Sequence, residues 1–218
     1  MKEIHLVVAD LAGTTVKDTG AVANAFSGAL AEHGIQVSPD AINAVRGASK
    51  RAAIASLLFP GADAARADAV YATFKDRLER AFRCETEPVA GAVQTFAWLR
   101  AHSIKLALNT GFDRDITALL IDVLGWRGIA DAVICGDDVT QGRPAPYMIF
   151  RAMEATATID VRHVLNVGDT VSDLHAAHHA GVAVSVGVLS GAHRREQLAS
   201  TPHGYLIESI ADLPDLWR

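Results

Sequence analysis

The sequence is poor in cysteine, in positive charge and in long apolar runs, and each shortage argues against a class of protein. Its two cysteines, Cys84 and Cys135, lie far apart without the spacing of metal ligands, so we expect incidental thiols in a reducing cytoplasm. A formal net charge of −5 argues against a nucleic-acid partner, which usually needs a basic stripe. No apolar run approaches the roughly 20 residues of a membrane helix, and Asp10 interrupts the amino-terminal apolar stretch, unlike a signal peptide. We therefore expect a cytoplasmic protein with no membrane or nucleic-acid partner.

The sequence does contain an alternation of strand-like and helix-like segments. Half of its 218 residues are hydrophobic, enough for a substantial core. Short apolar runs typical of strands occur at 4–9, 105–109, 132–135, 164–167 and 183–188. Helical patterns separate the later runs, at 90–101, 114–124, 145–155 and 172–180. This order favours an α/β fold with a doubly wound parallel sheet.

The stretch from 19 to 88 has no convincing strand. It has helical patterns at 21–33, at 39–59 with a break near Gly47, and at 64–82; Ser38-Pro39 is typical of a helix start with proline in the first turn. We therefore predict a small α-helical cap domain, 19–88, inserted into a core domain of residues 1–18 and 89–218. We expect hinges near 16–20 and 87–91, and a tail at 205–216 that completes the core.

An acidic turn of small residues follows the first apolar run and has the sequence Asp10-Leu11-Ala12-Gly13-Thr14-Thr15-Val16. Parallel α/β sheets place catalytic groups at the carboxyl ends of their strands, and Gly13 lets the backbone turn sharply there. If Asp10 attacks phosphorus, a carboxylate two residues further on would be the natural proton donor to a departing alcohol. Because Ala12 stands at that position, we predict a leaving group that needs no ordinary protonation.

Three further segments with chemically useful side chains follow predicted strands: Asn109-Thr110-Gly111, Gly142-Arg143-Pro144-Ala145-Pro146 and Gly168-Asp169-Thr170-Val171-Ser172-Asp173. The ends of parallel strands converge on one crevice, so we expect these segments to meet Asp10 there. Carboxylates bind Mg²⁺ through hard oxygen ligands, while Thr110, Arg143 and backbone N–H groups suit phosphoryl oxygens. The set predicts phosphoryl chemistry through an aspartyl-phosphate on Asp10.

Taken together, these segments resemble the haloacid dehalogenase superfamily over essentially the whole chain, and within it the phosphonoacetaldehyde hydrolase (phosphonatase) group. The resemblance is carried by Asp-x-Ala-Gly-Thr-Thr-Val at 10–16, Thr-Gly-aromatic-x-Arg at 110–114, Gly-Arg-Pro-x-Pro-x-Met at 142–148 and Gly-Asp-Thr-Val-Ser-Asp at 168–173. Most members of the superfamily carry Asp where Ala12 stands, and usually Lys where Arg143 stands.

The resemblance implies roles for individual residues. Asp10 would be nucleophile and metal ligand, the Ala12 carbonyl and Asp169 would complete the Mg²⁺ shell, and Asp173 would be a further ligand or its support. The phosphate would be bound by Thr110, Gly111 and Arg143. Since Ala12 would contribute only its backbone, the loss of a side chain there need not harm metal binding.

The same group uses a cap lysine that forms a Schiff base with the substrate aldehyde, and the matching position is Lys50 in Gly47-Ala48-Ser49-Lys50. An imine would make the carbon fragment an electron sink, so that C–P cleavage releases an enamine and no alkoxide needs a proton. Lys50 must be partly neutral to attack an aldehyde, and burial beneath a closed cap and the nearby Arg46 would both favour the neutral amine.

The chain also departs from the group. Ala53 stands where the group has a histidine one helical turn beyond the lysine, and Phe112 where it has tyrosine. No cysteine occurs near Gly20, where the group has one in its cap linker. Because the cap determines which substrate fits, these differences bear on substrate identity.

Two other functions remain open. One is a phosphatase acting on a small phosphate ester or another phosphonate, with substrate groups or water supplying the proton. The other is a non-catalytic phosphate-binding domain that has lost its acid. A small phosphonate or phosphorylated metabolite is the expected ligand, and the apolar segment 21–30 is a possible homodimer face.

Overall fold

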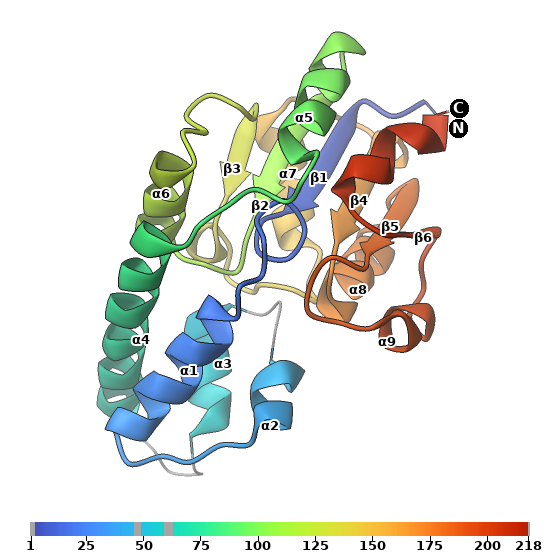
Figure 1. Ribbon diagram of the computed structural model, residues 1–218. Helices are drawn as coiled ribbons and strands as arrows, with labels where there is room; N and C mark the ends of the chain where they lie inside the picture. The colour runs from blue at the N-terminus through green and yellow to red at the C-terminus, as the bar shows by residue number, and fades with distance from the viewer. Residues whose placement is uncertain (1–2, 46–48, 59–62, 218) are drawn as a thin grey trace.

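The computed structural model describes residues 3–45, 49–58 and 63–217, which form a sheet covered by helices on both faces and a helical insert beyond one end of its strands (Figure 1). Within these residues the sheet has six parallel strands in the order β3-β2-β1-β4-β5-β6. They are β1 Leu6–Asp10, β2 Lys105–Asn109, β3 Ala132–Ile134, β4 Val164–Gly168, β5 Val184–Val188 and β6 Tyr205–Ile207. The predicted doubly wound α/β fold is confirmed.

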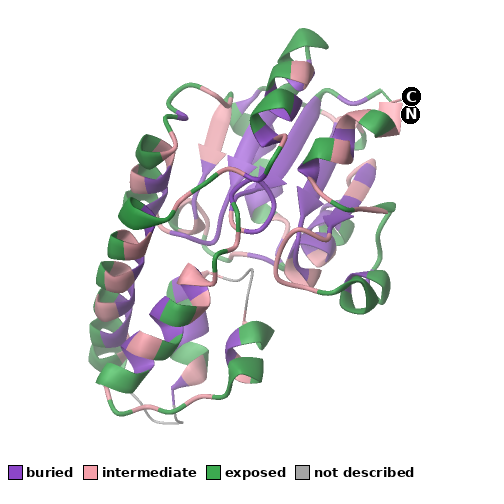
Figure 2. Cartoon of the chain, in the orientation of Figure 1, coloured by how far each residue is buried: buried purple, intermediate pink, exposed green. Residues whose placement is uncertain are grey.

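Alternate residues of β1 enter two different cores. Val7 and Ala9 belong to the core beneath α5 and α6, whereas Leu6 and Val8 belong to the core beneath α7 and α8. Both faces are therefore covered, which is why most residues of the central strands are apolar and why these strands appear almost wholly buried in Figure 2. The helices and 3-10 turns of this part are α5 Ala92–Ala101, α6 Arg114–Val123, η1 Gly136–Asp138, α7 Tyr147–Ala155, η2 Val161–His163 and α8 Val171–Ala180.

The carboxyl-terminal segment completes the sheet, as predicted, but with more regular structure than the sequence indicated. A short helix, α9 Arg195–Ala199, leads to β6, which pairs with β5. The last segment, η3 Ile210–Trp217, buries Ile210 and Leu213 and packs against α5. Strand β6 is only three residues long and its residues are exposed or half-buried, so it lacks the apolar run that identified the other strands.

Within the described residues, four helices form the insert between β1 and β2: α1 Ala21–Glu32, α2 Pro39–Ala44, α3 Lys50–Leu57 and α4 Ala64–Cys84. The predicted start at Ser38 is confirmed, because its side chain accepts a hydrogen bond from the N–H of Ala41 and Pro39 follows in the first turn. The pattern at 39–59 forms two helices, α2 and α3; Gly47 and Phe59 lie outside the described residues.

Helices α1 and α4 form the core of the insert. Val70, Phe74, Leu78 and Phe82 of α4 are buried at intervals of four residues, the spacing that places side chains on one helix face. Their neighbours on α1 include Phe26, whose ring centre lies 4.5 Å from that of Phe74. The apolar face of α1 is thus packed inside the monomer, and the homodimer face that we suggested at 21–30 stays a prediction.

Two linkers join the insert to the sheet, where we expected the hinges. They run side by side and antiparallel, with a bridge between Val16 and Pro88. The N–H of Lys17 donates to the Glu87 carbonyl at 2.9 Å, and the N–H of Val89 donates to the Thr15 carbonyl at 2.9 Å. Among the described residues, none of the helices combines the length and apolar character needed to span a membrane.

Candidate active site

The candidate site lies at the carboxyl ends of β1, β2 and β4. Asp10 is the last residue of β1, and Asp169 directly follows β4, which pairs with β1 on one side. Thr110 directly follows β2, which pairs with β1 on the other side. In this strand order the chain leaves β1 toward β2 and later returns to β4, so the crevice at their ends is the topological switch point where open α/β sheets bind ligands.

The turn after β1 holds Asp10 in place. The Leu11 carbonyl accepts hydrogen bonds from the N–H groups of Thr15 and Val16, at 3.0 and 2.8 Å, and the Thr15 hydroxyl donates to the Asp10 carbonyl at 2.9 Å. Gly13 has φ of 94°, a left-handed conformation that glycine adopts without the steric cost that other residues bear. These hydrogen bonds fix the backbone from which the Asp10 side chain projects at the end of β1.

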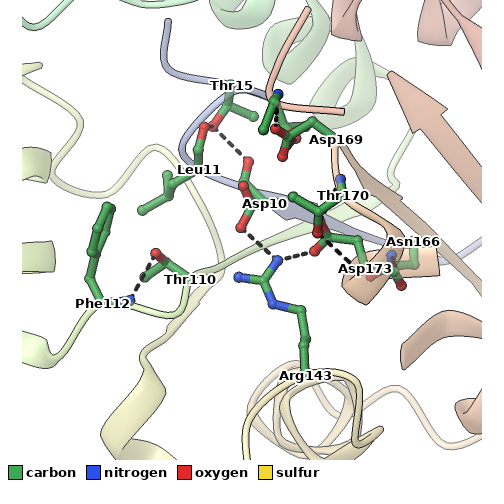
Figure 3. Close-up of polar contacts among 12 residues, drawn as sticks. Asp10, Leu11, Thr15, Thr110, Phe112, Arg143, Asn166, Asp169, Thr170 and Asp173 are labelled. Carbon is green, nitrogen blue, oxygen red and sulfur yellow. Dashed lines mark hydrogen bonds and ion pairs between the residues drawn. The ribbon is translucent and has the colours of Figure 1, made fainter. Parts of the chain in front are cut away.

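Arg143 binds two carboxylates at once (Figure 3). Its Nη1 donates to Asp10 Oδ1 at 2.7 Å and also to Asp173 Oδ1. The second Asp173 oxygen accepts hydrogen bonds from the N–H and hydroxyl of Thr170. All these side chains are buried, so Asp173 and Thr170 hold the guanidinium against Asp10.

The rest of the Arg143 guanidinium retains hydrogen-bonding capacity. Among the described residues its buried Nε–H has no hydrogen-bond partner. A buried donor without a partner carries a desolvation cost, and an anionic oxygen would relieve it.

Thr110 and Lys50 meet at the border between sheet and insert. The Thr110 hydroxyl accepts a hydrogen bond from the N–H of Phe112 at 3.2 Å. The backbone N–H of Lys50 donates to the Gly111 carbonyl at 3.2 Å, so the start of α3 rests directly on the turn after β2. The Lys50 side chain is buried, with 7% of the residue exposed, and its Nζ lies 5.2 Å from the centre of the Phe112 ring.

The predicted site residues enclose a cavity of about 30 Å³, room for one or two water molecules. Seven of the eight line it: Asp10, Ala12, Lys50, Thr110, Gly111, Arg143 and Asp169. The eighth, Asp173, contributes through its contact with Arg143. Arg46, which we expected beside Lys50, lies outside the described residues, and Ala53 is a buried residue of α3.

Sequence reasoning missed the apolar wall of this cavity, which Val22 and Phe26 of α1 form together with Phe112. The two α1 residues had the appearance of ordinary helix core, and only the packing of the insert over the sheet reveals their second role. The cavity is therefore lined both by polar groups at the strand ends and by these apolar side chains.

The donor set suits a magnesium ion. Asp10 and Asp169 end neighbouring strands and line the cavity together with Ala12. Protein sites for Mg²⁺ use one or two carboxylates, and waters and substrate oxygens complete the octahedron. In the part of the chain that the structure describes, no three His, Cys, Asp or Glu side chains gather into a metal-binding group. A site built from two carboxylates, a backbone carbonyl and a substrate oxygen does not need three such side chains. That Asp173 is a ligand stays a prediction, and both its oxygens have protein partners.

A polar contact joins the insert to the sheet next to the cavity. Tyr71 of α4 donates its hydroxyl hydrogen to Asp113 Oδ2 at 2.6 Å, and Lys75 Nζ lies 3.1 Å from the same oxygen. Asp113 also caps α6, accepting from the N–H of Ile116. We call Tyr71, Lys75 and Asp113 the insert–core contact; it lies one residue beyond Phe112 of the cavity wall.

Burial and hydrogen bonding oppose each other at this contact. Burial alone would raise the pKa of Asp113, but hydrogen bonds from Tyr71 and Lys75 outweigh it and leave the pKa below its ordinary value. Burial, reinforced by the bond to Asp113, raises the pKa of Tyr71. Asp113 is therefore anionic and Tyr71 neutral near pH 7, the pair that makes a strong charged hydrogen bond.

A parallel sheet with an aspartate at the tip of its first strand, an arginine beside it and a helical insert above defines the class of capped α/β hydrolases. The family model of haloacid dehalogenase-like hydrolases matches residues 7–187. The chain belongs to this family.

Individual relatives agree with that assignment. A phosphonoacetaldehyde hydrolase from Hahella chejuensis is 33% identical over 82% of this chain, which spans 66% of that relative's length. Another from Latilactobacillus sakei is 31% identical over 100% of the chain and 84% of its own length. Among solved structures, a phosphonoacetaldehyde hydrolase like protein from Oleispira antarctica superposes with a TM-score of 0.88 at 21% identity, covering 98% of this chain and 91% of that one. At that identity the likeness concerns the fold alone.

Proposed function

We propose that this hydrolase cleaves the C–P bond of a small phosphonate aldehyde such as phosphonoacetaldehyde, with Mg²⁺ as cofactor. One observation carries the proposal: the buried Lys50 and Asp10 line the same small cavity, in which Ala12 offers no acid. An amine facing a carboxylate nucleophile suits a substrate with an aldehyde at one end and phosphorus at the other. The names of the relatives from Hahella chejuensis and Latilactobacillus sakei support the same substrate.

Lys50 acts on the carbon end. Its neutral amine attacks the aldehyde carbon, and uptake of one proton from solvent with loss of one water leaves a protonated imine. When Asp10 then attacks phosphorus, the C–P bond breaks and its electron pair moves into the imine, which becomes an enamine on Lys50. No proton has to reach a leaving oxygen, which accounts for Ala12.

The sheet side acts on the phosphorus end. Arg143 and Thr110 bind the phosphoryl oxygens, and the Nε–H of Arg143 is available for this purpose. Asp10, Asp169 and the Ala12 carbonyl would hold Mg²⁺, which would supply positive charge that reduces the repulsion between the Asp10 carboxylate and the phosphonate. Water then attacks the aspartyl-phosphate and releases phosphate and Asp10.

The carbon fragment leaves last. The enamine takes up a proton at carbon, and water hydrolyses the resulting imine to acetaldehyde and the free Lys50 amine. The apolar wall of Val22, Phe26 and Phe112 fits a fragment with no further charge. Residues 19–88 act as the cap over the core of 1–18 and 89–218, since a cavity of about 30 Å³ cannot admit a phosphonate unless the cap opens.

Phosphate release from phosphonoacetaldehyde and from a panel of phosphate esters, with Mg²⁺ and after its removal by EDTA, tests this function. We expect the phosphonate to be preferred and the chelator to abolish its turnover. Lys50→Arg keeps the positive charge but forms no imine, and we expect it to lower phosphonate turnover at least about a thousandfold, since a covalent route is lost. Preferential turnover of esters that survives Lys50→Arg would establish a phosphatase instead. Phosphate binding without any turnover would establish a non-catalytic domain.

A further inference from the structure

The loop that follows β5 lies against Asp169, although none of its residues belongs to the four segments predicted to carry chemistry. The N–H of Ala192 donates to Asp169 Oδ2 at 2.7 Å. The N–H of His193 donates to the Asp169 carbonyl at 3.3 Å. The loop thus contacts both the side chain and the backbone of this residue.

The same loop also contacts the turn after β1. The Ser190 hydroxyl donates to the Gly13 carbonyl at 2.8 Å, one peptide beyond the Ala12 carbonyl. The Thr14 hydroxyl of that turn lies 3.4 Å from Asp169 Oδ1. Ser190 and Ala192 therefore join the two strand ends that hold the proposed metal ligands.

Two glycines leave room for the Asp169 carboxylate. A Cβ on Gly191 would lie 2.1 Å from Asp169 Oδ2, and one on Gly13 would lie 2.3 Å from the same oxygen. Gly13 has a left-handed backbone as well, but Gly191 does not. At Gly191, then, the backbone conformation would accept alanine, and only the closeness of Asp169 forbids it.

We propose that Ser190, Gly191 and Ala192 form a positioning segment that fixes the Asp169 carboxylate relative to the β1 turn and thereby determines cation affinity. None of these three residues lines the cavity assigned to the proposed substrate. The hydrogen bond from Ala192 occupies one side of Oδ2 and orients the carboxylate. The identity of the cation as Mg²⁺ rests on the proposed function.

Gly191→Ala is the sharpest test, because its methyl group must displace either the loop or the Asp169 carboxylate. We expect the affinity of the full chain for Mg²⁺ alone, measured by calorimetric titration, to fall at least about tenfold. We expect Ser190→Ala, which removes only one hydrogen bond, to lower it about threefold. Mn²⁺ binding followed by electron paramagnetic resonance gives a second readout that is independent of turnover.

Gly28→Ala is the matched control. A Cβ at Gly28 would lie 2.5 Å from the Arg77 guanidinium in the insert, the mobile end of a long side chain; the variant therefore adds the same methyl group far from Asp169, and we expect its Mg²⁺ affinity to equal that of the wild type. Gly191→Ala or Ser190→Ala with wild-type affinity would overturn the inference. A wild type that binds neither ion would overturn the proposed function itself. If Gly191→Ala does not fold, Ser190→Ala decides.

Discussion

Arg143 satisfies two buried carboxylates through a single nitrogen. Nη1 contacts both Asp10 and Asp173, and all three side chains are at most 6% exposed. Removal of one partner from a buried ion pair leaves an uncompensated charge, which costs more than the pair itself contributes. Asp173 is thus important for the fold as well as for the placement of the arginine beside Asp10.

This arrangement predicts different outcomes for two substitutions at 143. Arg143→Ala should lower the free energy of unfolding by about 3–5 kcal/mol, because it leaves two carboxylates unpaired. Arg143→Lys should lose no more than about 1.5 kcal/mol, since one ammonium can replace the one nitrogen that makes both contacts. Urea denaturation in metal-free buffer measures both values. Arg151→Ala, which removes an exposed ion pair with Glu154, is the control and should change stability by less than about 1 kcal/mol; equal losses for Lys and Ala at 143 would contradict this account.

Asp10, Thr110 and Asp169 could be predicted to share a site because each stands at the end of an apolar strand, whereas Lys50 lies on a helix of the insert and was identified only through the resemblance. Asp10, Thr110 and Asp169 stand at strand ends that a parallel sheet must bring together, so their meeting follows from the topology. The positioning segment 190–192 could not be predicted in this way. It acts through a backbone N–H group and through the absence of a side chain at Gly191, and neither feature marks a residue as functional in a sequence. The roles of Val22 and Phe26 in the cavity wall could not be predicted either, because the same apolar residue types occur in helix cores and in cavity walls.

At the level of elements, helix α4 is joined to the start of α6 by the insert–core contact. Tyr71→Phe removes only the hydroxyl that binds Asp113, so the insert should open more often while keeping its own core. We expect amide exchange at Lys17 and Val89, whose N–H groups connect the two linkers, to accelerate several-fold. Thr73→Val, on the same helix but bonded to His33 inside the insert, should leave both amides unchanged. Unchanged exchange in Tyr71→Phe would show that the contact does not hold the insert closed.

The same contact has a predictable dependence on pH. The pKa of Asp113 lies below its ordinary value of 3.8, so its stabilising effect is fully present above the unfolded pKa and is lost as the pH falls through the lower folded value. The difference in unfolding free energy between wild type and Asp113→Asn should therefore be constant from about pH 7 to 5 and shrink toward pH 3. A difference that grows as the pH falls would have the wrong sign for this assignment.

The strands and helices differed in how accurately they could be predicted from the sequence. The strands buried on both faces, β1, β2 and β4, are mostly apolar, and their ends were predicted to within two residues. Edge strand β6 and helix α9 were not predicted, because three half-exposed residues and a five-residue helix have too little periodicity. The division of 39–59 into α2 and α3 was anticipated only as a break near Gly47.

At the level of the whole molecule, the proposed function requires the insert to move, because a cavity of about 30 Å³ is too small for a phosphonate. Ser49 at the start of α3 and Gly142 on the sheet side offer a way to prevent that motion, because a Cβ on Gly142 would lie 3.5 Å from that of Ser49, within the range of a disulfide. We expect the double variant Ser49→Cys, Gly142→Cys, made in a Cys84→Ser background, to lose more than about 90% of its turnover when oxidised and to recover it on reduction. The reduced protein is its own control. Full turnover by the oxidised form would show that the insert need not open.

The most direct test of the central claim, that Lys50 holds the carbon fragment while Asp10 takes the phosphorus, is reductive trapping. The enzyme would be incubated with phosphonoacetaldehyde and Mg²⁺, treated with borohydride, digested and analysed by peptide mass spectrometry. The account predicts an N-ethyl group on Lys50 from the reduced acetaldehyde imine, no ethyl group on other lysines, and no trapping in Lys50→Arg. Continued release of phosphate and acetaldehyde with an unmodified Lys50 would contradict it.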